Sequence, residues 1–238
     1  MTEQPFSAPL ETLRKRVQEA TQNLLGDTIG IGDGDWNRPS RLPGWSRANV
    51  ATHLAANAEA LSRLIGAAVH GDSVELYPEP EARRADIEDG SSLTSLDLQI
   101  CLDTSAGSLE RAMDDVPDWS APVELRDRQF TLTHLPMARL SEVVVHHLDL
   151  NCGFDVDWLQ QGPARWLLQW ALLWHAADPD LPAVRLESTS GLVANLGPGD
   201  QRSTVSGTDA QLWCWLMGRS TPGDIPAGAD GLSLPLRS

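Results

Sequence analysis

Apolar residues recur every three or four positions through the first 150 residues, and this spacing predicts a series of amphipathic helices. The expected helices cover residues 7–25, 46–70, 93–113 and 132–152. The buried stripe expected for the third helix consists of Leu96, Ile100, Leu109 and Met113. Ser46 is the expected N-cap of the second helix, and its stripe places His53 on or beside the inward face. Four such helices joined by connections of unequal length predict a helical bundle.

The pattern changes after Gly153. A Trp-rich apolar helix with Pro163 in its first turn is expected there, followed by short extended runs. These runs are AVRLEST, GLVANLG and STVSG, with LSLPL as a possible final strand. A further helix, TDAQLWCWLMGRS, should stop at Gly218. The sequence therefore predicts an α+β two-domain protein, with a helical bundle over residues 1–154 and a small α+β domain over residues 155–238.

Glu142 and His146 stand four residues apart in the predicted fourth helix. On a helix this spacing places both side chains on one face, and Asp149 shares that face. A carboxylate and an imidazole held in this way can bind one metal ion when a third ligand comes from elsewhere, and His53 is the candidate. The alternative interpretation is a solvated Glu–His ion pair. The almost entirely apolar surroundings favour the metal, because a buried carboxylate is costly unless a cation meets it.

The composition narrows the range of partners. The formal charge of −15 and the sequence pI of about 4.6 argue against binding to nucleic acid or to an anionic membrane surface. Cys101, Cys152 and Cys214 are widely spaced and form no CxxC motif, so we expect neither a disulfide framework nor a thiolate zinc site. The N-terminal residues lack an apolar signal core, and a cytoplasmic, monomeric protein is expected.

Four segments, in this order, carry a resemblance to a known family: LPGWSRANVATHLAANAEAL, YPEPEARRADIEDGS, RLSEVVVHHLDL and VSGTDAQLWCWLMGRS. Together they resemble the landmarks of the mycothiol-dependent maleylpyruvate isomerase family, and they span nearly the whole chain. The resemblance implies a DinB-like four-helix metal-binding bundle, followed by a small α+β domain related to sterol-carrier proteins.

The resemblance places the metal ligands of the family at His53, Glu142 and His146, with the adjacent His147 as a non-coordinating residue. It also implies that Arg83 and Arg219 bind carboxylates of the substrate or of the thiol cofactor. The implied cofactors are Zn²⁺ and mycothiol. The implied reaction is the cis–trans isomerisation of maleylpyruvate to fumarylpyruvate through a thiol adduct, with Arg219 as a catalytic residue.

Two other functions fit the same residues. A mycothiol S-transferase would activate the thiol in the same way but would release the conjugate of thiol and electrophile. A non-catalytic module would use the bundle to bind a metal or a small ligand, and its second domain would carry an apolar molecule. Zinc is favoured by the ligand type, although His and carboxylate ligands also suit iron, nickel or manganese.

Overall fold

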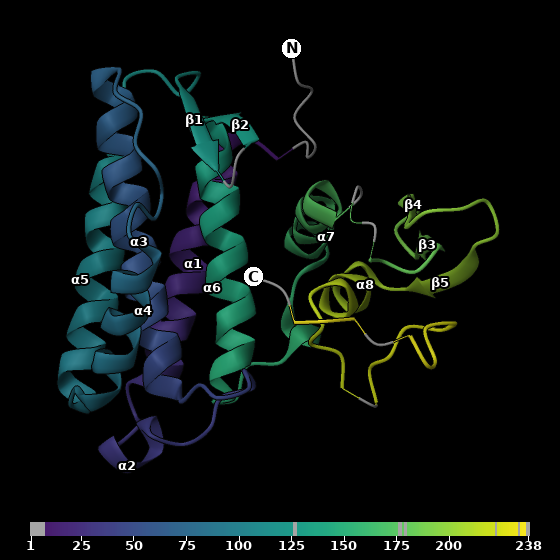
Figure 1. Cartoon of the computed structure of the whole chain (residues 1–238), viewed down its shortest axis with the longest axis horizontal. Coiled ribbons are helices and arrows are strands. Elements are labelled where there is room, and N and C mark those ends of the chain that lie inside the picture. The colour runs from purple at the N-terminus through teal and green to yellow at the C-terminus, as the bar shows by residue number, and fades with distance from the viewer. Residues whose placement is uncertain are drawn as a thin grey trace. The chain divides into compact units, whose positions relative to one another are not determined.

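The computed structural model describes residues 8–125, 128–175, 178, 180–221, 223–232 and 234–236. The chain divides into two compact units, which are drawn together in Figure 1. One unit is Leu10–Phe154, and the other contains the described residues from Asp155 onward. Among the described residues, no helix is long and apolar enough to cross a bilayer.

Four long helices form the first unit and run alongside one another in Figure 1. They are α1 (Leu10–Thr28), α3 (Arg47–His70), α5 (Ser95–Asp114) and α6 (Leu135–Leu150). The shorter elements are α2 (Asp33–Trp36), α4 (Pro80–Asp89), the 3-10 turns η1 (Gly90–Ser92) and η2 (Leu132–His134), and a hairpin of β1 (Pro122–Leu125) with β2 (Arg128–Thr131). Helix α3 packs against α5 and α6, and α1 packs against α6. The predicted helical bundle is confirmed.

Helix α3 begins where the sequence predicted. Ser46 adopts an extended backbone, its side chain accepts the N–H of Asn49 at 3.2 Å, and Asn49 Oδ1 accepts the N–H of Ser46 at 2.9 Å. This reciprocal capping satisfies donors that a helix N-terminus otherwise leaves unpaired. The Asn49 amide also donates to the Ile87 carbonyl at 2.8 Å. The cap therefore ties α4 to the start of α3.

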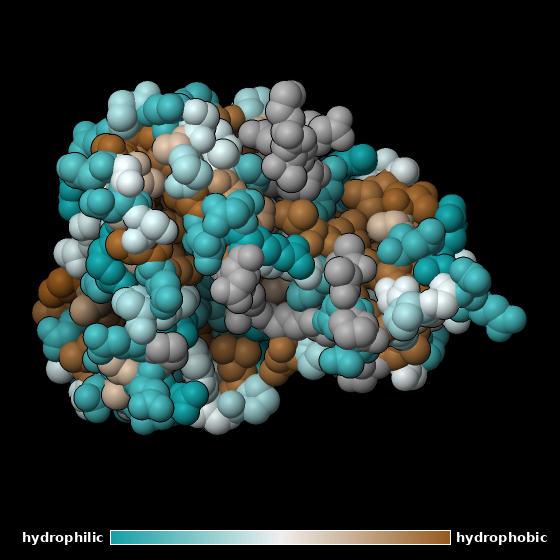
Figure 2. Space-filling view, turned by 45° about the horizontal axis from the view of Figure 1, so that its top comes forward, coloured by the Kyte–Doolittle hydropathy of each residue, from teal (hydrophilic) through white to brown (hydrophobic). Residues whose placement is uncertain are grey.

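The stripe predicted for α5 is half wrong. Leu109 and Met113 are buried, but Leu96 is 68% exposed and Ile100 is 49% exposed. The buried row instead continues through Ser105, Leu102 and Leu98, in steps of three and four residues. Ser105, which is small and polar, interrupts the apolar residues of this row, and the predicted row through Leu96 and Ile100 lies two residues, or about half a turn, out of phase with it. Single exposed apolar residues are ordinary, and Figure 2 shows them interspersed with hydrophilic ones on one face.

Gly90 lets the segment after α4 approach α3 closely. A Cβ atom at this position would overlap the side chain of Thr52, which precedes His53. We expect Gly90→Ala to lower the free energy of unfolding by about 1–3 kcal/mol in urea denaturation, because the packed side chain has little room to move. Gly66→Ala on α3 is the control, since nothing lies within 4 Å of its Cβ position. There alanine should stabilise by up to about 1 kcal/mol. Equal effects of the two substitutions would contradict the close approach.

The second unit has the mixed composition expected of it. Helices α7 (Gln161–His175) and α8 (Asp209–Leu216) accompany a three-stranded sheet. The sheet order is β4-β3-β5, from β3 (Val184–Ser188), β4 (Val193–Leu196) and β5 (Ser203–Gly207), with η3 (Val156–Trp158) preceding α7. Strand β3 pairs antiparallel with β4 and parallel with β5. The α+β fold class is confirmed.

The expected strand at LSLPL is wrong for its described residues, which are 232 and 234–236. Leu232 donates its N–H to the Ala229 carbonyl at 2.9 Å and so belongs to a turn. Pro235 has no N–H to offer a neighbouring strand, which works against pairing here. Helix α8 ends before Gly218, whose φ of 72° is left-handed. Trp213 and Trp215 of α8 pack in the core of this unit and are 0% and 3% exposed, whereas Trp158 is 65% exposed.

Candidate metal centre

Helix α6 positions two of the three predicted metal ligands. His146 is 1% exposed, and the side chain of Glu142, one turn earlier, is 16% exposed. His146 Nε2 lies 3.4 Å from Glu142 Oε2. His53 on α3 brings its Nε2 to 3.1 Å from the same oxygen. Potential ligand atoms of all three residues lie within 4.8 Å of one another, so the structure brings the predicted triad together from two helices.

Asp149 fixes the orientation of His146. Its carboxylate is completely buried and lies 2.9 Å from His146 Nδ1, so Nδ1–H donates to Oδ2. The lone pair of the ring is then on Nε2, which is buried and has no hydrogen-bond partner among the described residues. A carboxylate behind a ligating histidine is the usual support of a metal site. This unsatisfied nitrogen beside the Glu142 carboxylate fits a divalent cation.

The electrostatics of the cluster suit a cation. Burial alone would raise the pKa of Glu142, but its interactions with the His146 and His53 imidazoles hold that pKa well below its usual range. Burial and the nearby His146 lower the pKa of His53 to about 4. Burial opposes protonation of His146, yet Asp149 and Glu142 outweigh it and raise that pKa. At neutral pH the cluster therefore offers an anionic carboxylate and a neutral imidazole, while a proton competes with the ion at His146.

Arg83 on α4 reaches the triad. Its Nη2 lies 2.6 Å from His53 Nδ1, and its guanidinium stacks over the Tyr77 ring, 4.0 Å from the centroid. Because arginine only donates, His53 Nδ1 accepts and the ring proton lies on Nε2, facing Glu142. Coordination of an ion through Nε2 would place the proton on Nδ1. Arg83 would then have to leave His53 for another acceptor.

Residues 8–151 match the family described as "Mycothiol maleylpyruvate isomerase N-terminal domain". The chain belongs to this family. Its fold is also that of two solved crystal structures, those of the mycothiol-dependent maleylpyruvate isomerase and of a variant with one histidine replaced by alanine. Each has a TM-score of 0.86 and 24% sequence identity, over 96% of this chain and 95% of the other. No curated protein matches the chain.

His147, the neighbour of His146 in this member of the family, faces another way. Its Nε2 lies 3.0 Å from Asp27 Oδ2, and its ring stacks on Phe154 with centroids 4.4 Å apart. Successive helical residues point about 100° apart, which separates the two imidazoles. His147 is therefore a packing residue between α6 and the end of α1, and His146 is the histidine beside Glu142.

The remaining residues that the sequence analysis considered lie outside the triad. His70 ends α3 and interacts with the Gly66 carbonyl at 2.7 Å, as expected for a terminal histidine. His134 is buried next to the α6 N-terminus. Arg219 belongs to the second unit, is 5% exposed and donates to the Met217 carbonyl at 2.5 Å. Its role, unlike its burial, stays a prediction.

The sequence analysis did not assign a role to two residues near the triad, Arg139 and Asn57. Arg139 is 3% exposed and donates through Nη1 to the Leu54 carbonyl at 2.9 Å and to Asn57 Oδ1 at 2.8 Å. This contact orients the Asn57 amide, whose Nδ2 donates to Tyr77 Oη at 3.1 Å. Burial lowers the pKa of Arg139 to about 10, against the opposing effect of Glu142, so the guanidinium stays charged at neutral pH. The available signal was its position three residues before Glu142.

Proposed function

We propose that the protein is a mycothiol-dependent cis–trans isomerase that converts maleylpyruvate to fumarylpyruvate with a bound divalent ion, zinc being favoured. The observation that carries the proposal is the convergence of His53, Glu142 and His146, from two helices, in a chain of the mycothiol maleylpyruvate isomerase family. Three protein ligands are the number found in catalytic zinc sites, which keep a further position open.

The protein's contribution is a preorganised and charged binding site. When bound, the ion and the thiol supply a thiolate at neutral pH, a nucleophile suited to reversible addition to a cis double bond. Asp149 holds His146 in one tautomer and one orientation. Glu142 supplies the negative charge that keeps a dication in a largely buried site.

Arg83 is proposed to bind a substrate carboxylate. It stands beside His53, and the Tyr77 ring holds the plane of its guanidinium. If coordination of His53 displaces it, a carboxylate is the acceptor that suits two parallel N–H groups. On the family resemblance, Arg219 is proposed to bind a carboxylate of the substrate or of the thiol cofactor.

The deciding experiment is an assay of the zinc-loaded protein with maleylpyruvate and mycothiol. We expect loss of the cis isomer with catalytic amounts of thiol, and no net consumption of thiol. Stoichiometric consumption of thiol with an electrophile would point to the S-transferase instead. Retention of zinc without turnover on either substrate would point to a binding module.

Arg83→Ala tests the substrate role within this assay. We expect KM for maleylpyruvate to rise roughly tenfold or more, because a charge-assisted bidentate contact is lost. Arg84→Ala is the matched control, since Arg84 is the exposed neighbour on the same helix. Its KM should stay at the wild-type value. Equal KM values for both variants would remove Arg83 from substrate binding.

A further inference from the structure

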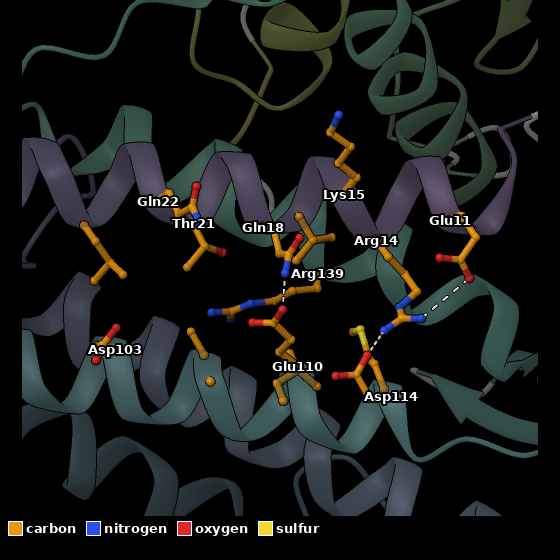
Figure 3. Close-up of a pocket in the computed structure, with 16 residues that line it drawn as sticks. Glu11, Arg14, Lys15, Gln18, Thr21, Gln22, Asp103, Glu110, Asp114 and Arg139 are labelled. Atoms are coloured by element: carbon orange, nitrogen blue, oxygen red, sulfur yellow. Dashed lines mark hydrogen bonds and ion pairs between the residues drawn. The ribbon is translucent and has the colours of Figure 1, made fainter.

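A cavity of about 630 Å³ lies within the helical unit, between α1 and α5. None of the three triad residues lines it. Figure 3 shows Arg139 extending into the space between the two helices, with Gln18 and Glu110 on either side. Val17, Leu25, Leu109 and Met113 supply apolar wall. The cavity therefore combines an apolar stretch of wall, within a lining that is otherwise largely polar, with the deeply buried cation of Arg139.

Arg139 is only partly satisfied by the protein. Both of its hydrogen bonds are made by Nη1, to neutral oxygens of Leu54 and Asn57. Among the residues that the structure describes, its Nε and Nη2 have no hydrogen-bond partner and no carboxylate forms an ion pair with it. Nε–H and one Nη2–H of a guanidinium are parallel donors on one edge. A buried charge with one free edge favours an anion that can accept from both donors.

The acidic residues that line the cavity do not fill this role: Asp103 forms no ion pair with Arg139 among the described residues, and the other three have partners of their own. Asp114 pairs with Arg14, and Glu110 accepts from Gln18, so both are held across the gap between α1 and α5. Figure 3 draws both bridges as dashed lines between the two helices. Glu11 lies 3.6 Å from the same Arg14. These carboxylates repel a dianion more strongly than a monoanion, which limits the charge of a suitable ligand.

We propose that this cavity binds a small monocarboxylate with an apolar body, whose two oxygens pair with the Nε and Nη2 of Arg139. The apolar body lies against the wall that includes Val17, Leu109 and Met113. Inorganic phosphate fits less well, because it carries more charge at neutral pH and has no apolar body to lie against the wall. The site is separate from the metal centre, although Arg139 also holds Asn57 on α3.

The test uses the zinc-loaded full chain with 13C-methyl-labelled methionine and hexanoate as the probe. Met113 lines the cavity, whereas Met217 belongs to the other unit and serves as the internal reference. We expect hexanoate to shift the Met113 methyl signal saturably and to leave Met217 unchanged. Hexan-1-ol has the same apolar body without the charge, and its affinity should be lower by a factor of about ten or more.

Because Arg139 joins two helices, the variant that probes the site changes another position. Ala106→Phe fills the cavity from α5, and Thr104→Phe adds the same ring at an exposed site of that helix. The hexanoate shift should disappear in the first variant and remain in the second. Three results would each overturn the proposal: a Met113 signal that does not shift with hexanoate, equal affinities for hexanoate and hexan-1-ol, or an unchanged shift in Ala106→Phe.

Discussion

Replacing His53 with alanine is expected to abolish most of the zinc binding proposed for this site and, with it, the proposed isomerase activity. The wild-type chain should hold about one ion, because three ligand atoms converge in a buried cluster. Without the imidazole, the remaining two ligands both come from α6, and the affinity should fall by more than about a hundredfold. Metal analysis after dialysis against a weak chelator measures the loss, and the cis-isomer assay measures its consequence.

The control for this substitution is His70→Ala. His70 is exposed at the end of the same helix and interacts only with a carbonyl of that helix among the contacts described. Zinc content and turnover should stay at wild-type levels in this variant. If His53→Ala retained its zinc, the triad would not be the metal site and the proposed chemistry would have no support.

Asp149→Asn is expected to weaken zinc binding by about 10–100-fold while the fold is kept. The carboxylate is buried and accepts the Nδ1 proton of His146, which leaves Nε2 free for the ion. The asparagine amide has the same shape and can still accept the hydrogen bond from His146 Nδ1–H. It lacks the negative charge, however, and can also turn its NH₂ group toward the ring. The affinity is measured by competition with a chromophoric chelator.

Asp115→Asn is the matched control, since Asp115 is an exposed residue at the end of α5. Its zinc affinity should equal that of the wild type. Circular dichroism of the two variants should coincide, because neither substitution changes side-chain volume. An Asp149→Asn protein with wild-type affinity would show that His146 needs no support from this carboxylate.

The helices and the triad could be predicted because both follow from spacing along the chain. Glu142 and His146 are four residues apart in a helix whose apolar surface is unmistakable, and His53 lies on an inward stripe. The phase predicted for the first half of α5 was wrong because the small polar Ser105 interrupts the apolar pattern of the buried row. The prediction of a strand at LSLPL was wrong because a strand forms only beside a pairing partner, and the sequence does not show which segment would pair.

The supporting residues were out of reach for a different reason. Arg139 and Asn57 are 82 residues apart, and only the packing of α6 on α3 brings them together. Their hydrogen bond depends on the rotamer of a long side chain and on which amide atom faces it, neither of which is encoded in spacing. Asp149 shares the face of His146, but a helical carboxylate is as readily solvated as buried. Asp149 supports His146 because the fold buries its carboxylate completely beside the ring.

Two of the proposed ligands, His53 and Glu142, stand 89 residues apart, so an ion held between them would act as a reversible cross-link of the chain. An unfolded chain has no such convergent set, and binding therefore favours the folded bundle by mass action. At a free ion concentration a hundred times the dissociation constant, the gain is about 2.7 kcal/mol. The melting temperature of the bundle should then rise with the concentration of the ion. In a cell short of the ion, the protein would be less stable as well as inactive.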